Sequence, residues 1–480
     1  MASDKIKPKT TVLEINNEKL YTMDDYSDLA RYQDQALGQL TMLQVYSHIL
    51  YFFPMPHDFS RDEIISELEA AITKVRQQVP WMGARVINVG KKEGNSGTYR
   101  PVACPLPEQA IDIADYTDEI PPYATFQARK APLSMIDTER LTPVSCFPMK
   151  FEDSDEHPAH VVRLQVSFIR GGVIIDFAFQ HNMGDASGHF GFVKLIATAM
   201  RGEEFPPAFL EKANLDRRNI IPLLKPHEKM LDHSHHKRPP VSDSTPLSTP
   251  LALNVKARYH IFRFTVASMA KLKYLASQRE GFDPDVPFIS TDDAICAFCW
   301  KHFIAVRTGR LPPDTKSRLG RQIDGRKLVG LPPDYMGEMA HTMNAWMTFG
   351  ELAEAPLSTI ASTLRKRLNE TNNLYHLRSF ATFIANEPDK STVTYAGKFD
   401  PAVDLGSSSI RTLSGVFPEF GKLGRPDFIR RPPSVPFPGT LVLYPGTPEG
   451  DCDGVACLTD ADFEALSANP EWNEFVEHIG

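Results

Sequence analysis

A histidine and an aspartate lie four residues apart in the segment Gln180–Gly188. A neutral imidazole close to a substrate hydroxyl can accept its proton near neutral pH, so His181 is a candidate general base. The spacing alone is weak evidence, because a chain with 15 histidines and 60 acidic residues often contains such a pair. On the pair alone, a surface histidine followed by a helix-capping Asp185 is an equally good interpretation.

The residues around this pair predict a strand, a corner and a helix. Residues 160–170 and 173–180 are rich in β-branched and aromatic side chains, and two glycines separate them, which predicts a β-hairpin. Residues 190–201 carry apolar side chains at helical spacing. We therefore expect His181 where a strand ends, with its ring free to face a cleft.

The length and composition indicate a soluble enzyme rather than a nucleic-acid or membrane protein. A chain of 480 residues is too long for one compact core and predicts two domains. The formal charge of −8 argues against nucleic acid or an anionic membrane as the main partner. The sequence has no apolar run of about 18 residues and no secretory signal. We expect a cytoplasmic enzyme that acts on small molecules.

The cysteines and clustered histidines do not predict a metal site. Cys296 and Cys299 lie in a segment typical of a capped helix, and no second Cys or His pair follows at zinc-site spacing. Buried structural thiols are the better interpretation. His233, His235 and His236 could bind a metal, but they lie in a polar, proline-rich segment where solvated side chains are expected. No metal is expected.

Strand and helix patterns alternate in both halves of the chain, which predicts an α/β or mixed α+β fold. The polar stretch between them predicts an N-terminal domain over residues 1–215, a crossover linker over 216–256 and a C-terminal domain over 257–480. The expected elements are a strand within 38–53, a helix from 60, a strand near 84–87, a strand over 258–265, a helix over 267–278, a helix from 291, a last strand near 440–445, and a terminal helix from 460 to about 478.

Several segments occur in the order seen in the BAHD acyltransferase superfamily, and they resemble its fungal trichothecene 3-O-acetyltransferase branch. The histidine–aspartate corner is similar to the family's HxxxD motif. Ile323–Arg326 resembles its Asp-x-Arg strand motif, and Glu419–Pro426 occupies the place of its Asp-Phe-Gly-Trp-Gly signature. The other similar segments are 79–86, 288–300, 332–337, 407–410 and 470–480.

The sequence departs from the family pattern mainly at the signature. Glu419 replaces its aspartate, and tryptophan is absent both there and from the Ser-Ser-Trp position. Ala186 replaces the glycine that often follows the HxxxD aspartate. The resemblance implies that the signature, here Glu419, Phe420, Gly421 and Gly424, shapes the fold rather than touching substrate. These changes therefore concern the contour of the cofactor path more than the chemistry.

The resemblance implies a fold, a reaction and roles for individual residues. The fold would be two similar-sized domains of the chloramphenicol acetyltransferase type, each a mixed sheet flanked by helices, with the active site in a channel between them. The reaction would be transfer of acetyl from acetyl-CoA to a hydroxyl of a fungal-type secondary metabolite, such as a terpenoid of the trichothecene kind. His181 would act as general base, and Asp185 would pair with Arg326 to hold the catalytic loop.

No acyl-enzyme is expected, since His181 can serve both proton transfers in a ternary complex and the sequence has no Gly-x-Ser-x-Gly nucleophile elbow. Two domains that enclose a channel need no partner, so we expect a monomer. Ser290 also fits an N-cap of the following helix, and the lysines also fit a solvated helix face. By position, the resemblance suggests these contacts with acyl-CoA: Lys271, Lys273, Ser290, Thr291, Ser407 and Ser408.

The sequence leaves two other functions possible. An enzyme of the same fold could acylate an amine or take its acyl group from a carrier protein, and it would keep His181. CoA binding by the isolated protein would distinguish a carrier-protein donor from a CoA donor. A non-catalytic binding protein could keep the fold alone, but the intact His181, Asp185 and Arg326 argue against it.

Overall fold

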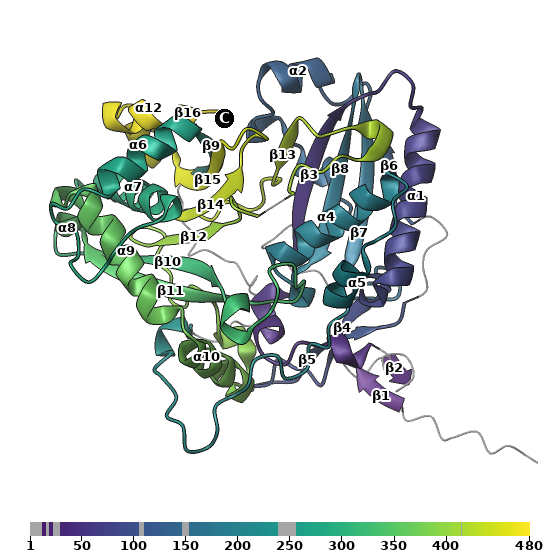
Figure 1. Cartoon of the computed structure of the whole chain (residues 1–480), viewed down its shortest axis with the longest axis horizontal. Helices are drawn as coiled ribbons and strands as arrows, with labels where there is room; N and C mark the ends of the chain where they lie inside the picture. Colours follow the sequence, from purple (N-terminus) through teal and green to yellow (C-terminus); the bar gives the residue numbers. More distant parts are fainter. Residues whose placement is uncertain are drawn as a thin grey trace, which may run out of the picture.

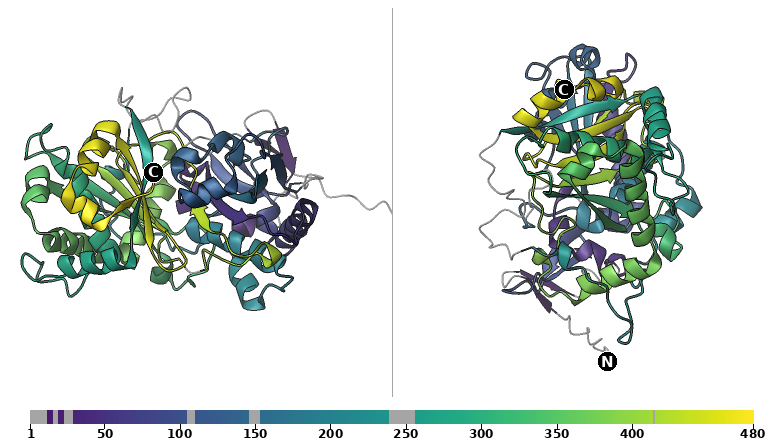
Figure 2. Two further views of the ribbon diagram at one scale, coloured as in Figure 1. Left: turned by 90° about the horizontal axis from the view of Figure 1, so that it is seen from above. Right: turned by 90° about the vertical axis from the view of Figure 1, so that its left-hand side faces the viewer.

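Two mixed β-sheets, each covered by helices, form two lobes that lie side by side (Figures 1 and 2). We call them the N-terminal lobe and the C-terminal lobe. The predicted fold class of two mixed sheets flanked by helices is confirmed. The computed structural model describes residues 12–15, 19–22, 29–104, 110–145, 153–238, 256–413 and 415–480.

The sheet of the N-terminal lobe has the strand order β13-β3-β8-β7-β6. β3, β8 and β7 are antiparallel neighbours, so the predicted hairpin before His181 is confirmed, and β6 runs parallel to β7. Helices α1 and α4 pack against each other beside this sheet (Figure 1). These elements are β3 (Tyr46–Pro54), β6 (Asp112–Asp115), β7 (Val162–Ile169), β8 (Gly172–Gln180), β13 (Phe428–Arg430), α1 (Arg61–Gln78) and α4 (Ala186–Met200).

Local sequence signals explain where these two helices begin. The Ser60 hydroxyl accepts the backbone N–H of Glu63, and the Glu63 carboxylate accepts the N–H of Ser60, a capping box that starts α1. Asp185 starts α4, because its carboxylate accepts the N–H of Ser187 at 2.9 Å. The predicted helices after 60 and around 190–201 are therefore confirmed.

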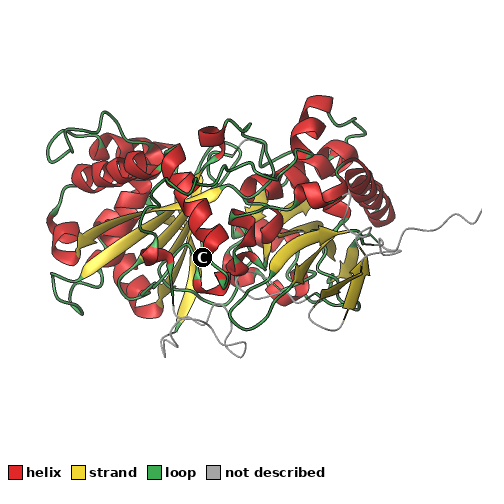
Figure 3. Ribbon diagram, turned by 90° about the horizontal axis from the view of Figure 1, so that it is seen from below, coloured by secondary structure: helices red, strands yellow, loops and turns green. Residues whose placement is uncertain are grey.

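The sheet of the C-terminal lobe has the order β11-β10-β12-β14-β15-β9-β16. β10, β12 and β14 are parallel, and the other pairs are antiparallel. Helices cover its outer face (Figure 3). These elements are β9 (Ala257–Phe264), β10 (Lys316–Asp324), β11 (Ala340–Thr348), β12 (Leu405–Ser409), β14 (Thr440–Pro445), β15 (Cys452–Thr459), β16 (Glu477–His478), α6 (Val266–Ala276), α7 (Thr291–Ala305), α8 (Phe349–Glu354), α9 (Leu357–Thr371), α11 (Asp460–Ser467) and α12 (Pro470–Phe475).

The remaining helices and strands are short or lie beside the two sheets. β4 and β5 form a two-stranded ribbon, as do β1 and β2. Their bounds are β1 (Val12–Ile15), β2 (Lys19–Thr22), β4 (Arg85–Val89), β5 (Thr98–Val102), α2 (Tyr123–Ala128), α3 (Thr138–Leu141), α5 (Pro207–Ala213) and α10 (Leu374–Asn386).

The two lobes share packing along the inner face of the second sheet. Ile261 on β9 and Val455 on β15 are buried in the same apolar core as the strands and helices of the N-terminal lobe. Strand β13 comes from the C-terminal part of the chain, but it pairs with β3, with Phe428 opposite Phe52. Burial of apolar surface between the lobes therefore stabilises both sheets together. The boundaries at 215 and 257 stay predictions.

The structure corrects the sequence analysis at three elements. Residues 37–43 form short 3-10 turns, and the strand expected within 38–53 begins only at Tyr46. β14 is not the last strand, because β15 and β16 follow it. The expected terminal helix is split into α11 and α12, since Pro470 lacks a backbone N–H and disfavours helical geometry at Asn469.

The prediction of solvated histidines in the crossover segment is wrong. His233 is 2% exposed and His236 is fully buried, and both rings pack against Phe380 on α10. The polar local sequence gave no sign of this packing, because the apolar partners of the two histidines lie in α10, far along the chain. No group of three or more His, Cys, Asp or Glu that could hold a metal ion occurs in the described ranges. None of the described helices is both long enough and apolar enough to cross a bilayer.

Candidate active site

His181 begins a 3-10 turn, η7 (His181–Met183), directly after β8. Its backbone N–H donates to the carbonyl of Val45 at 2.9 Å, just before β3. The next side chain, Asn182, donates to the carbonyl of Gly38 at 2.6 Å. The central hairpin and the 37–43 turns therefore fix the backbone that carries the histidine.

Asp185 points to the C-terminal lobe and is paired there. Its two carboxylate oxygens accept hydrogen bonds from the Arg326 guanidinium at 2.8 and 2.7 Å, and one of them accepts the N–H of Met339 at 3.1 Å. Arg326 is 3% exposed and also donates to the carbonyls of Tyr335 and Gly337. Asp185 therefore joins the loop after His181 to Arg326, just after β10, and to Met339, just before β11. A bidentate ion pair of this kind fixes orientation strongly.

The ring of His181 faces Glu338, a residue that the sequence analysis did not single out. His181 Nδ1 lies 3.2 Å from Glu338 Oε2, and the Glu338 side chain is fully buried whereas that of His181 is 24% exposed. The distance suits an ion pair, although the angles fall short of a well-aligned hydrogen bond. Neither atom has a hydrogen bond to any other described residue. The other oxygen of Glu338 accepts the N–H of Ala340 at 2.8 Å.

The groups around His181 raise the pKa of its ring. Burial lowers the pKa of His181, but the facing Glu338 carboxylate, the backbone of His181 itself and the charge of Asp185 together outweigh burial, so the pKa lies above the ordinary value of 6.5. Burial raises the pKa of Glu338, Asp185 raises it further, and His181 lowers it. His189 on α4 stays neutral, because burial lowers its pKa to about 3. The Nδ1 edge of His181 is buried, so the exposed part of the ring lies on the other side.

The turn that carries Glu338 approaches the histidine closely because two glycines make room for it. A Cβ atom on Gly184 would lie 2.1 Å from the carbonyl oxygen of Met336, and one on Gly188 would lie 2.3 Å from it. Behind the turn, Tyr335 and Met339 are buried in an apolar core with the 37–43 turns and α10. The turn is therefore clamped between parts of both lobes.

The only sequence signal for Glu338 was its place in a motif. The similar segment 332–337 resembles the family's Tyr-x-Gly-Asn turn through Tyr335 and Gly337, and Glu338 stands where that motif has asparagine. Its partner His181 is 157 residues away, so no local pattern links them.

The suggested CoA contacts lie in different parts of the C-terminal lobe. Ser290 is the N-cap of α7 and forms a capping box with Asp293, which agrees with its alternative interpretation as an N-cap. Thr291 is the first residue of this helix. Ser407 is 4% exposed and, by strand register, lies on the helix-covered face, whereas Ser408 lies on the opposite face. Ser409 donates to Asp292 at 2.6 Å, so the end of β12 and the start of α7 meet in one corner.

The two lysines lie elsewhere. Lys271 and Lys273 are exposed on α6, and Lys271 forms an ion pair with Glu474 on α12. This is the solvated helix face that was their alternative interpretation. In the described part of the chain, neither lysine contacts His181.

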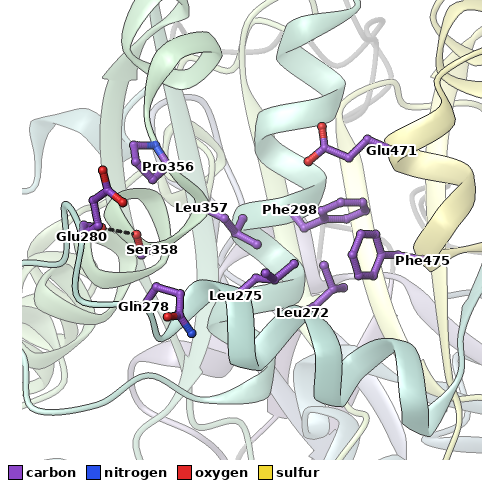
Figure 4. Close-up of a pocket in the computed structure, with 10 residues that line it drawn as sticks. All are labelled: Leu272, Leu275, Gln278, Glu280, Phe298, Pro356, Leu357, Ser358, Glu471 and Phe475. Atoms are coloured by element: carbon purple, nitrogen blue, oxygen red, sulfur yellow. Dashed lines mark hydrogen bonds between the residues drawn. The ribbon is translucent and has the colours of Figure 1, made fainter.

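A surface hollow of about 270 Å³ lies on the helical layer of the C-terminal lobe (Figure 4). Its walls come from α6, α7, α9 and α12, with apolar side chains such as Leu272, Phe298 and Phe475, and with Glu471 at the edge. None of the suggested site residues lines it. The described lining of the hollow is mostly apolar and contains no histidine, so the hollow lacks a candidate general base of the kind that His181 provides.

The signature residues pack against the N-terminal lobe. Phe420 is fully buried, with its ring centroid 5.2 Å from that of Phe53 on β3. Gly421 has φ +56°, and a Cβ there would lie 2.3 Å from the carbonyl oxygen of Met200, while Gly424 has φ +76°. The carbonyl of Glu419 accepts a hydrogen bond from Arg201 at 2.8 Å. These contacts bind the segment before β13 to the N-terminal lobe.

Comparison with known proteins identifies the family. The model for the trichothecene 3-O-acetyltransferase-like N-terminal domain matches residues 45–200, and the model for the Transferase family matches residues 139–473. The O-acetyltransferase epaC of Aspergillus niger is 55% identical over 459 residues, covering 95% of this chain and 98% of that protein. The trichothecene 3-O-acetyltransferase of Fusarium sporotrichioides is 30% identical over 447 residues, covering 92% and 95%.

A solved structure agrees with these matches. The crystal structure of the Fusarium sporotrichioides enzyme complexed with coenzyme A and T-2 superposes with a TM-score of 0.84 at 28% identity, covering 93% of this chain and 99% of that one. The Transferase-family match alone spans more than half of the chain. The chain therefore belongs to the Transferase family of BAHD-like acyltransferases, and it is an O-acetyltransferase with a trichothecene 3-O-acetyltransferase-like N-terminal domain.

Proposed function

We propose that this O-acetyltransferase moves acetyl from acetyl-CoA to a hydroxyl of a small secondary metabolite, with His181 as general base. The observation that carries the proposal is the setting of His181. Its Nδ1 edge is buried against a carboxylate, and the rest of its ring is partly exposed beside the turn from the other lobe. The similarity to O-acetyltransferases, and the CoA and T-2 held by one relative, support the two substrate classes.

The reaction needs one proton carrier. As the substrate oxygen attacks the thioester carbonyl carbon, Nε2 of His181 takes the hydroxyl proton, which typically accelerates such a step ~10²–10⁴-fold. The tetrahedral intermediate then collapses, the C–S bond breaks, and the same proton passes to the departing CoA sulfur. The products are the acetyl ester and free CoA thiol, and the histidine returns to its neutral form.

A covalent acyl-enzyme on cysteine is disfavoured by burial. Only a thiolate is a good nucleophile, and burial raises the pKa of every described cysteine. For Cys296 it raises the pKa to about 11. The described cysteines are Cys104, Cys296, Cys299, Cys452 and Cys457. Cys146 lies outside the described residues. The burial of these thiols supports a direct transfer within a ternary complex.

For the CoA donor, Thr291 and Ser408 are the better supported of the suggested contacts. They belong to the two segments that meet where Ser409 bonds Asp292, at the junction of α7 and β12. Both side chains are partly exposed, so their hydroxyls can reach a ligand. Lys271 would first have to leave Glu474.

The first test is a thermal-melt titration with acetyl-CoA and with CoA, because it needs no acceptor. A ligand at 100 times its Kd adds about 2.7 kcal/mol to the stability, which raises Tm by roughly 2–4 °C in a protein of this size. Thiol release from acetyl-CoA is then measured with T-2 and a panel of alcohols and amines. A flat melt, or transfer to amines only, would contradict the proposal, and His181→Ala is the control for the chemistry.

A further inference from the structure

The carboxylate of Glu338 is in an unusual position for a charged group. It is fully buried: Oε1 accepts the Ala340 N–H, Oε2 faces His181 Nδ1, and the Tyr395 hydroxyl lies beside the carboxyl group. A buried carboxylate is costly unless it is paired, because it gives up its hydration. In the described part of the chain, the partner of Oε2 that can carry a positive charge is His181.

We propose that Glu338 is the positioning residue of the catalytic base. The carboxylate lies 3.2 Å from Nδ1, and its negative charge favours the neutral tautomer with the proton on Nδ1, which leaves Nε2 unprotonated and free to take the hydroxyl proton. When that proton arrives, the carboxylate stands beside the imidazolium and compensates its charge. This inference rests on the proposed role of His181 and extends it, because the base becomes a pair built from both lobes.

The other polar groups around the pair do not take this role. Asp185 also lowers the free energy of the protonated ring, but its oxygens are held by Arg326 in a bidentate ion pair. His189 is neutral, since burial lowers its pKa to about 3. The Tyr395 hydroxyl lies beside Glu338, and burial raises its pKa, so it remains an uncharged donor. Among the described residues, Glu338 is therefore the neighbouring carboxylate that has no arginine or lysine partner and can compensate the positive charge of His181.

A purely structural role for Glu338 would need only an acceptor for the Ala340 N–H at the start of β11. The oxygen of a glutamine side chain supplies such an acceptor equally well, but it carries no charge. Asparagine at this position in the family motif would likewise lack the charge. Glu338→Gln therefore separates the two roles, because it keeps the turn and removes only the carboxylate.

The test follows the titration of His181 itself. Diethyl pyrocarbonate acylates the unprotonated imidazole, and mass spectrometry of the peptide containing His181 gives its rate of modification between pH 5 and pH 9. We expect a midpoint above 6.5 in the wild type and in Glu354→Gln, an exposed control on α8. In Glu338→Gln, burial still lowers the pKa of His181 but the carboxylate no longer raises it, so the midpoint should fall by about one pH unit or more.

An unchanged midpoint in Glu338→Gln, or a wild-type midpoint below 6.5, would overturn the pairing. If Glu338→Gln does not fold, the wild-type midpoint and that of Glu338→Asp, which keeps the charge, decide the question. Thiol release tests the base separately. If His181→Ala keeps full activity while Glu338→Gln shifts the midpoint, the pair exists but the proposed function fails.

Discussion

At the scale of single residues, two carboxylates near one histidine have different tasks. Asp185 is bound to Arg326 across the lobe boundary, while Glu338 faces the ring of His181. The sequence predicted the first pair through a motif resemblance. It could not predict the second, because the closeness of Glu338 and His181 results from the packing of Met336 against α4 and not from any spacing along the chain.

The two roles predict different losses on mutation. His181→Ala should lower kcat ~10²–10⁴-fold. Because burial raises the pKa of Glu338, its carboxyl can take up a proton once His181 is gone, so Tm should change less than in Asp185→Ala. Asp185→Ala should lower the stability by about 1.5–3 kcal/mol, because the buried Arg326 loses two charge-assisted hydrogen bonds and keeps only the half-exposed Asp324 as an acidic partner. Urea unfolding and thiol-release assays measure both. Equal losses of activity with unchanged unfolding would contradict this division.

At the scale of elements, the hairpin, the helix after it and the clamped turn form one unit. The strands and α4 could be predicted, because alternation and helical spacing are properties of the local sequence. The turn before β11 could be named from its motif, but its contact with α4 depends on Gly184 and Gly188. Strand β15 was missed because its sequence, CDGVACLT, contains a glycine and two cysteines and alternates weakly.

The close approach of this turn makes a small substitution damaging. The φ of Gly184 is 164°, which any residue can adopt, so Gly184→Ala adds only volume. Its new Cβ would meet the Met336 carbonyl and push the turn with Glu338 away from His181. We expect a loss of about 1–3 kcal/mol in unfolding free energy and a larger drop in kcat than in acetyl-CoA affinity.

Gly309→Ala is the matched control, because nothing lies within 4 Å of its Cβ position. It should leave both stability and kcat near the wild-type values. If Gly184→Ala behaved like Gly309→Ala in urea unfolding and in turnover, the turn would not be clamped as the structure shows.

At the scale of the whole molecule, several histidines are buried where the crossover segment, β11 and α10 pack together. His341 is fully buried on β11, and burial lowers its pKa to about 3, while that of the neighbouring His376 falls to about 4. Above pH 6.5 such a residue is neutral in both the folded and the unfolded chain. Below 6.5 only the unfolded chain binds the proton, so the stability falls as the pH falls.

This linkage predicts how one substitution changes acid stability. His341→Leu removes a buried titrating group of similar size. We expect the dependence of unfolding free energy on pH between 6 and 4.5 to become shallower by about 1.4 kcal/mol per pH unit. Urea unfolding at four pH values measures this slope. An unchanged slope would mean that His341 is protonated in the folded protein.

The pairing of β13 with β3 has a consequence for how the protein is made. The N-terminal lobe lacks the strand beside β3 until residues 428–430 have left the ribosome. Until then β3 presents an open hydrogen-bonding edge next to buried aromatic residues, which favours pairing with other chains. We expect a fragment of residues 1–255 to aggregate when produced alone and to become soluble when residues 256–480 are produced with it. Solubility of the first fragment alone would contradict this dependence on the end of the chain.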